Sequence, residues 1–376
     1  MTTRDPVRHI IGTGAVQIGA IATPLLSPLI IGGLIIGLNI GEIEAGSLIT
    51  VELLVLGITS ILIAPFMARI PHHLLAIAAS LVLILSLVFS TQADGINELY
   101  LWRGIGGMAS GCLIATANAA IAQARSPTLL YGVTWSTAYL VTAIMTIVIT
   151  ETNDVISFDV IYAYLAIAFL LLLPLLWFVP RHGGETTAGP FPMDTLLSGC
   201  VLSLGITLIG VSMMAYYAFL GQFAVRIDAN AAQTGWIIAT AQLAGIIGGL
   251  TAAPLSNRMG VIKALVLTTL LHVVAIALAV STQQIMVLGF AAFCEAVLFI
   301  IMTPLMFTLA AQIDNKGRWA AAVGGVYVLS TSLGPVIGAM LMENYGPMAI
   351  AWLQVLAALP AVYLFVKVHR RSSKAT

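Results

Sequence analysis

Twelve long apolar segments, separated by short polar connections, run through the whole sequence. A helix needs about 20 apolar residues to cross the hydrocarbon core of a bilayer, and these segments are of that order. Charged residues make up only 8% of the chain, whereas soluble domains carry roughly 25%. The sequence therefore predicts an all-α polytopic membrane protein with spans near 10–39, 47–69, 73–91, 98–123, 129–150, 158–178, 196–225, 235–257, 261–281, 285–311, 319–342 and 348–367.

The overall charge and the cysteines argue against several other kinds of site. The formal net charge is zero, so nothing in the composition predicts binding to nucleic acid. Cys112, Cys200 and Cys294 lie inside apolar segments, away from the loops where a disulfide or zinc site forms. We expect no metal and no cofactor. The first apolar stretch is longer than a signal-peptide core, so we expect it to be retained as a helix.

Basic residues are distributed unevenly between the two sides of the membrane that alternate connections would occupy. With the N-terminus inside, thirteen of the fifteen Lys and Arg are cytoplasmic and only Arg226 is in an outer connection. Because Lys and Arg mark cytoplasmic loops, we predict an even number of spans in the plasma (inner) membrane with both termini in the cytoplasm. The cytoplasmic set is Arg4, Arg8, Arg69, Arg125, Arg181, Arg258, Lys263, Lys316, Arg318, Lys367, Arg370, Arg371 and Lys374.

A polar segment rich in Gly, Pro and Thr, residues 179–195, divides six spans from six. Its composition is typical of a flexible linker. We predict an N-terminal six-helix bundle at 1–180, a cytoplasmic linker at 181–195 and a C-terminal six-helix bundle at 196–376.

The two halves also share residues at a constant offset of 189, as from Gly32 to Gly221. An offset of six spans preserves membrane orientation, so the repeat is parallel. Two such halves with a site between them at mid-membrane are a transporter architecture. The other matched positions are Gly46 with Gly235, Ala64 with Ala253, Pro65 with Pro254, Arg69 with Arg258, Ala122 with Ala311, and Gln123 with Gln312.

Short motifs stand at corresponding places in the halves. The second span is followed by APFMARIPHH, Ala64 to His73, and the eighth by APLSNRMGVIK, Ala253 to Lys263. The fourth span holds WRGIGGMASG and the eleventh SLGPVIG. With the topology and the repeat, these motifs resemble the major facilitator superfamily, whose members carry G-x-x-x-D-R-x-G-R-R after the second helix and R-x-x-x-G in the fourth. The resemblance implies two six-helix bundles, with a substrate cavity lined by the first, fourth, seventh and tenth helices.

The loop motifs depart from the family pattern where an acid is expected. Ala68 replaces the acid in the first copy, and Asn257 replaces it in the second. Arg69, Asn257 and Arg258 are candidates for gating contacts that form in one conformational state and break in the other; plain positive-inside charge is the alternative. The fifth span reads GVTWSTAYLV and lacks the motif of drug–proton antiporters, which counts against that branch.

Two ionisable residues lie near the outer ends of their spans. Glu52 and Arg103 are each about 7–9 Å deep, judged by a rise of 1.5 Å per residue. Burying a charge in a bilayer is costly, so both are functional candidates. Equal depth indicates that they could form a pair. A fixed structural ion pair is one interpretation, and exchange of Arg103 between Glu52, an anionic substrate group and a proton-linked state is the other.

Glu295 lies deeper, about 15 Å from either edge of its span, and no Lys or Arg shares that depth. A carboxyl group there is expected to be neutral until water reaches it, which is the behaviour of a proton-coupling site; a permanently protonated, hydrogen-bonded Glu295 is the alternative. His272 is similarly deep, in the ninth span. That span is peripheral in the family, so we expect a hydrogen-bonded structural histidine that need not touch Glu295.

Amides and aromatic rings dominate the remaining polar residues of the spans. Such a site suits a small organic molecule that is neutral or monoanionic. The candidates for lining the substrate cavity are Gln17, Asn118, Trp135, Tyr139, Tyr216, Tyr217, Gln222, Gln242 and Tyr327.

The sequence thus predicts a secondary transporter that works by alternating access, carries a small-molecule substrate and is coupled to H⁺. No Walker loop is present, so the energy must come from a gradient. We expect a monomer in the lipid bilayer and no enzymatic activity. A facilitator and a multidrug or sugar efflux antiporter are the alternatives within the fold, and a transport-fold receptor is a more distant one.

Overall fold

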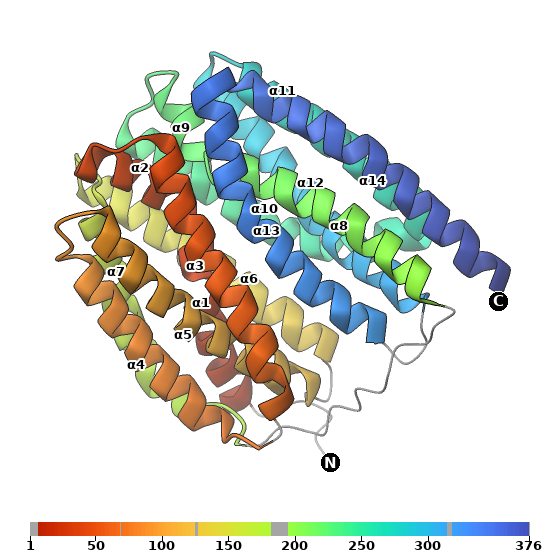
Figure 1. Ribbon diagram of the computed structural model, residues 1–376, viewed down its shortest axis with the longest axis horizontal. Coiled ribbons are helices and arrows are strands. Elements are labelled where there is room, and N and C mark those ends of the chain that lie inside the picture. The colour runs from red at the N-terminus through yellow and green to blue at the C-terminus, as the bar shows by residue number, and fades with distance from the viewer. Residues whose placement is uncertain (1–6, 68, 125–126, 182–194, 314–317, 376) are drawn as a thin grey trace. The chain divides into compact units, whose positions relative to one another are not determined.

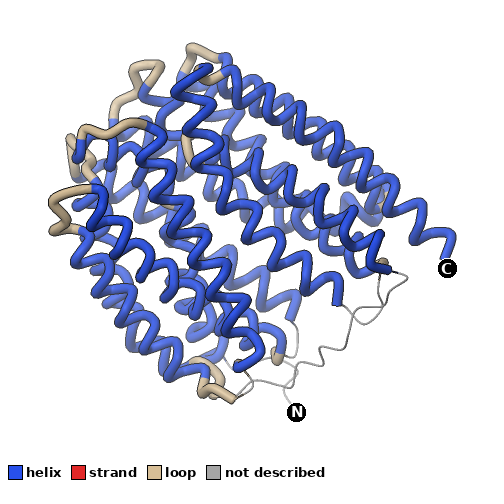
Figure 2. Tube along the Cα trace, viewed as in Figure 1, coloured by secondary structure: helices blue, strands red, loops and turns tan. Residues whose placement is uncertain are grey.

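The computed structural model describes residues 7–67, 69–124, 127–181, 195–313 and 318–375, and all regular secondary structure in these ranges is helical (Figures 1 and 2). The chain forms two compact units, Met1–Thr186 and Thr187–Thr376. Residues 182–194 of the predicted linker lie outside the described ranges.

The first unit contains seven α-helices and two short 3₁₀ segments within its described residues. They are α1 (Val7–Leu25), α2 (Ser27–Leu38), α3 (Glu42–Ile63), η1 (Ala64–Phe66), α4 (His72–Ser90), α5 (Ile96–Ala122), α6 (Pro127–Thr152), α7 (Phe158–Leu172) and η2 (Leu173–Phe178).

The second unit contains a further seven α-helices in the part of it that is described. They are α8 (Leu196–Tyr217), α9 (Leu220–Val225), α10 (Ala231–Met259), α11 (Val261–Ser281), α12 (Ile285–Ala311), α13 (Arg318–Tyr345) and α14 (Met348–Ala375).

The described helices provide ten spans by length and hydropathy, and twelve when two bent pairs are each counted as one. The first pair is α1 with α2, bent by 50°, and the second lies within α10, bent by 47° between Gly249 and Thr251. The prediction of twelve spans is therefore confirmed, with most boundaries shifted by only a few residues.

Two predicted spans are interrupted rather than continuous. The span at 10–39 breaks at Leu26, between Pro24 and Pro28, because proline lacks the N–H that continues a helix. The span at 196–225 breaks between Tyr217 and Leu220.

Close backbone approach between α3 and α5 sets the depth of the first unit's polar centre. A Cβ atom at Gly107 would lie 2.4 Å from the Glu52 carbonyl oxygen, and one at Gly111 would lie 2.6 Å from that of Leu56. Small residues permit such contact in a bilayer, where lipid supplies no hydrophobic force between helices. The WRGIGGMASG segment is therefore a packing surface toward α3.

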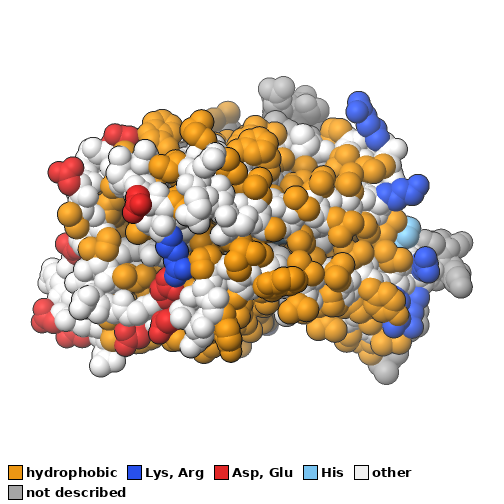
Figure 3. All heavy atoms as spheres, turned by 90° about the horizontal axis from the view of Figure 1, so that it is seen from above, with side chains coloured by type: hydrophobic (Ala, Val, Ile, Leu, Met, Phe, Trp, Pro, Cys, Tyr) orange, Lys and Arg blue, Asp and Glu red, His pale blue; other side chains and the backbone are white. Residues whose placement is uncertain are grey.

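The second unit is held by a core that draws side chains from α8, α10, α11, α12, α13 and α14. Ile206 from α8, Met302 from α12 and Phe365 from α14 are among its fully or nearly fully buried members. Apolar side chains also cover much of the face in Figure 3.

Candidate functional site

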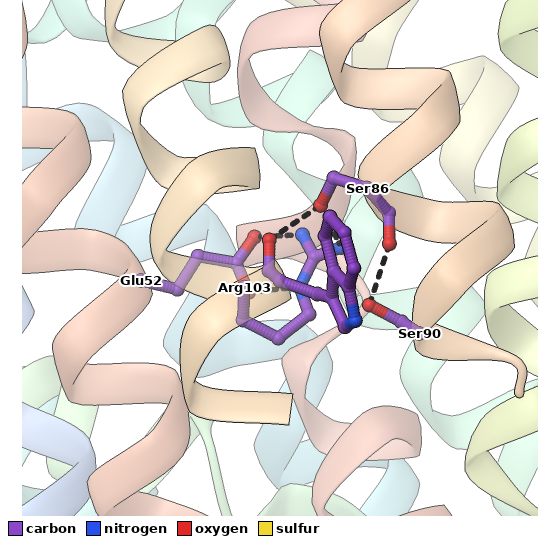
Figure 4. A network of polar contacts seen from close by, with 5 residues as sticks. Glu52, Ser86, Ser90 and Arg103 are labelled. Carbon is purple, nitrogen blue, oxygen red and sulfur yellow. Dashed lines mark hydrogen bonds and ion pairs between the residues drawn. The ribbon is translucent and has the colours of Figure 1, made fainter. Parts of the chain in front are cut away.

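A buried ion pair joins α3 to α5 in the first unit (Figure 4). Arg103 Nε donates a hydrogen bond to Glu52 Oε2 at 3.0 Å, and Arg103 Nη2 donates to Glu52 Oε1. The Arg103 side chain is fully buried and that of Glu52 is 2% exposed. This two-point contact is the strong geometry for arginine and a carboxylate. The pairing predicted from equal depth is therefore present.

The remaining faces of Arg103 are occupied by α4 and α7. Its Nη1 donates to Ser86 Oγ at 3.5 Å, and its Cζ lies 4.9 Å from the centre of the Tyr162 ring. Ser86 Oγ donates to the Trp102 carbonyl at 2.5 Å, and Ser90 Oγ donates to the Ser86 carbonyl at 2.7 Å. Arg103 is thus held on several sides, which favours the interpretation of a fixed structural pair.

Sequence reasoning missed Ser86 and Tyr162 as members of this centre. A serine and a tyrosine within an apolar span are common and carry no spacing signal. Only the packing of α4 and α7 against α5 brings them to the guanidinium group.

The second unit holds a different pair, Glu295 on α12 and His272 on α11. Glu295 Oε1 lies 3.7 Å from His272 Nδ1, and the side chains are 2% and 1% exposed. The distance is too long for a direct hydrogen bond. Neither ring nitrogen of His272 makes a regular hydrogen bond within the described residues. The sequence did not require His272 and Glu295 to touch, and the close packing of α11 and α12 brings the two side chains together.

Aromatic and amide groups surround this pair. Phe299 lies beside the His272 ring, with 6.4 Å between ring centres, and stacks on Tyr327 at 6.3 Å. Tyr216 and Tyr217 of α8 are within electrostatic range of Glu295, and Tyr217 shares a side-chain hydrogen bond with Gln242 of α10. Among the described residues, no Lys or Arg forms an ion pair with Glu295.

The predicted cavity residues occupy several environments. Gln17 and Tyr216 are fully buried, and their polar side-chain atoms have no hydrogen-bond partner. The partly buried Trp135 packs beside Tyr131, with 5.6 Å between the ring centres, and shares a side-chain hydrogen bond with it. An unsatisfied buried polar group is costly and calls for a functional reason.

The other predicted cavity residues are less distinctive. Asn118 is exposed, Gln222 is half-buried on α9, and Gln242 is buried in its contact with Tyr217. Tyr139 packs against the Trp135 ring at 6.1 Å.

The predicted gating residues Arg69, Asn257 and Arg258 are all exposed, and no ion pair involves them in the described part of the chain. Ala68 lies outside the described residues.

A buried histidine that sequence reasoning missed fastens the first of these loops. His72 contacts the Met67 carbonyl through Nε2 at 3.0 Å, and its backbone N–H donates to the Arg181 carbonyl at 3.1 Å. The His73 ring also packs edge-on against Trp177. These contacts tie the start of α4 to Trp177 of η2 and to Arg181 just beyond it.

No group of three or more His, Cys, Asp or Glu side chains in the described ranges could hold a metal ion.

The sequence profile of the Major Facilitator Superfamily matches residues 195–376, the second unit of the chain. Over 94% or more of its length, the chain is similar in fold to solved transporters. These two findings agree with the resemblance of the motifs to the major facilitator superfamily. Its members are transporters, and the fold supports membrane transport by alternating access. A comparison with curated protein sequences finds no significant match.

Three solved structures illustrate this similarity. A bacterial homologue of the human lysosomal transporter Spinster has a TM-score of 0.70 at 12% identity, covering 97% of this chain and 96% of that one. The human organic anion transporter MFSD10 (TETRAN) has a TM-score of 0.69 at 14% identity, covering 96% and 100%. A D-xylose–proton symporter has a TM-score of 0.72 at 14% identity, covering 94% and 96%. At such identities the similarity concerns the fold.

Proposed function

We propose that this transporter carries a small organic solute, neutral or monoanionic, across the plasma (inner) membrane and couples its movement to protons. The distribution of basic residues predicts that both termini lie in the cytoplasm. In this proposal the protein acts as a monomer. The neighbours include a sugar–proton symporter and an organic anion transporter, so both classes of solute occur on this fold.

The observation that carries the proposal is the environment of Glu295. Its carboxyl group is 2% exposed in the middle of α12 and faces a histidine rather than a lysine or arginine. Charge on such a group is stabilised only when water or a protonated partner is present. A conformational change that alternately wets and dries this position would therefore bind and release a proton, as coupling requires.

Glu52 and Arg103 have a different role in this proposal. Their charges already neutralise each other in a two-point contact, with Ser86 and Tyr162 on the remaining sides of the arginine. Proton exchange there would leave a buried guanidinium without its partner, which is costly. The pair maintains the helix arrangement while Glu295 exchanges the proton.

Transport by reconstituted protein tests the role of Glu295. Proteoliposomes containing wild type, Glu295→Gln or Glu343→Gln would be given D-xylose as an uncharged probe and benzoate as a monoanionic probe, with and without an imposed pH gradient. We expect Glu295→Gln to lose gradient-driven accumulation but retain exchange of a transported probe. Glu343, an exposed carboxyl group on α13, supplies the matched control and should behave like wild type.

Gradient-driven accumulation by Glu295→Gln at the wild-type level would remove Glu295 from the mechanism. Exchange without accumulation in the wild type would instead identify a facilitator.

A further inference from the structure

One face of α1 carries buried polar groups that the first unit does not satisfy. Thr13 Oγ1 and both Oε1 and Nε2 of Gln17 are without a hydrogen-bond partner, although both side chains are fully buried. A lost hydrogen bond of this kind costs about 1–3 kcal/mol. Three unpartnered atoms, one turn apart on a single helix, therefore indicate a site that is completed by something other than this unit's own side chains.

Helix geometry places these groups on a different side of α1 from its close contacts with η2 and α5. Gly12 and Gly19 share the face that packs inward, since a Cβ atom would lie 2.6 Å from the Phe178 backbone at Gly12 and 3.0 Å from Leu113 at Gly19. Thr13 and Gln17 are four residues apart and share another face.

Empty space adjoins this second face. Gly14 stands three residues before Gln17, so the two positions are neighbours on the helix surface. Gly14 is buried, yet a Cβ atom built on it would have no atom within 4 Å. The unpartnered amide of Gln17 is therefore next to an enclosed volume.

The proline break adds an acceptor on the same side of the helix. Pro24 has no N–H, so the Ala20 carbonyl loses its usual intrahelical donor. Position 20 is three residues beyond Gln17 and lies on the same face. Discontinuous helices that expose such backbone groups are how transporters build solute sites.

The buried charges of the first unit, within its described residues, cancel each other. The Asp, Glu, Lys and Arg side chains buried there are Glu52 and Arg103, which bind each other and are flanked by α4 and α7. A charged solute at Thr13 and Gln17 would lose its hydration without gaining a counter-ion. The groups on offer are one hydroxyl, one carboxamide and a backbone carbonyl, which together both donate and accept.

We propose that Thr13, Gly14 and Gln17 form a binding site for an uncharged solute that carries hydroxyl or carboxamide groups. The inference rests on the proposed transport function and narrows its solute from neutral or monoanionic to uncharged. The Gln17 amide both donates to and accepts from the solute, and the Thr13 hydroxyl supplies a second contact one turn away.

Ligand-free stability gives the first test, because a binding site assembled at a cost to stability behaves unlike a structural contact. Gln17→Leu and Thr13→Val remove unpartnered polar atoms, so we expect each melting temperature to stay the same or rise by about 2–4 °C. The controls are Gln354→Leu and Thr142→Val, since Gln354 donates to the Ser212 carbonyl and Thr142 donates to the Ala138 carbonyl. These controls should stay the same or lose stability. A clear fall in the melting temperature of Gln17→Leu would overturn the proposal.

Binding to two series of probes matched in size gives the second test. D-Glucose, D-gluconate and D-glucosamine vary charge on a hydroxylated solute, and benzamide, benzoate and benzylamine vary it on a carboxamide. We expect purified wild type, without any gradient, to bind an uncharged member at least about tenfold more tightly than its charged partners, and Gln17→Leu to weaken that binding about tenfold or more. Thr142→Val should bind as wild type does.

Preference for a charged member, failure of both uncharged members to bind, or unchanged binding by Gln17→Leu would each overturn the proposal. Glu295→Gln separates this test from that of proton coupling. Loss of gradient-driven accumulation with preserved charge preference would support both proposals, whereas wild-type accumulation with the same preference would remove only the role of Glu295.

Discussion

Each unit buries one ionisable pair, between α3 and α5 in the first and between α11 and α12 in the second, but the pairs differ in kind. Arg103 meets Glu52 in a two-point contact, while Glu295 meets His272 at 3.7 Å without a direct hydrogen bond. At the offset of 189 residues, Arg103 corresponds to Ala292 and Glu295 to Gly106. Arg103 and Glu295 therefore occupy positions about one helical turn apart on corresponding helices. The two ionisable pairs do not align with each other in the repeat.

The two pairs differ in whether the charge of the basic partner can change. An arginine stays charged at all physiological pH values, so the first pair contains a fixed positive charge. A histidine changes charge near neutral pH in ordinary surroundings, so a histidine–carboxyl pair can have more than one proton occupancy. The first centre can fix the helix arrangement, and the second can respond to a proton.

The largest expected effect comes from breaking the fixed pair. Arg103→Leu leaves Glu52 buried without a partner, so we expect the free energy of unfolding to fall by about 3–5 kcal/mol. Thermal unfolding in detergent measures this change. Arg371→Leu, at an exposed position on α14, should show no such loss.

The double variant Glu52→Gln/Arg103→Leu sharpens this prediction. It contains no buried charge at the site, so it should recover much of the stability that Arg103→Leu loses. Equal instability of the single and double variants would show that packing, rather than charge compensation, dominates this centre.

A smaller effect is expected from the helix contact that positions Glu52. Gly107→Ala adds a Cβ atom at 2.4 Å from the Glu52 carbonyl, so α3 and α5 must separate, at a cost of about 1–3 kcal/mol. Gly104→Ala on the same helix meets nothing within 4 Å and should be neutral or stabilising. Thermal unfolding of the two variants side by side measures the difference, and similar stability would argue against a tight α3–α5 contact.

The smallest effect is expected at the pair formed by Glu295 and His272. His272→Phe keeps a ring beside Phe299 but removes a group that titrates, so the pH dependence of proteoliposome transport should become shallower. Turnover at the optimum should stay within about tenfold, or 1.4 kcal/mol. A pH profile identical to that of wild type would show that His272 does not contribute to the pH dependence, and would support the structural role predicted from sequence.

Depth along each helix was predictable from sequence, since a rise of 1.5 Å per residue converts residue number into position. That reasoning found the spans and the pairing of Glu52 with Arg103. It did not find the contact of Glu295 with His272, because depth does not specify which side of a helix a residue occupies. His272 was assigned to a peripheral helix, and the rotation of α11 turns it toward α12.

At the predicted gating loops, too, the sequence did not identify the residue that makes the buried contact. Motif comparison identified Arg69 and Arg258, yet both are exposed, and the buried contact at the first loop is made by His72. A histidine that follows a proline at the start of a helix has no distinctive spacing. Its partners are the carbonyls of Met67, before α4, and of Arg181, beyond η2.

The sequence by itself determined that the chain lives in a bilayer, how many times it crosses and how deep each ionisable residue lies, because hydropathy and helical rise act locally. The tertiary structure alone decided that Arg103 is satisfied, that Glu295 faces a histidine and that Gln17 is buried without a partner. These outcomes depend on the rotation of each helix about its axis, which is set by side-chain packing between segments far apart in the chain.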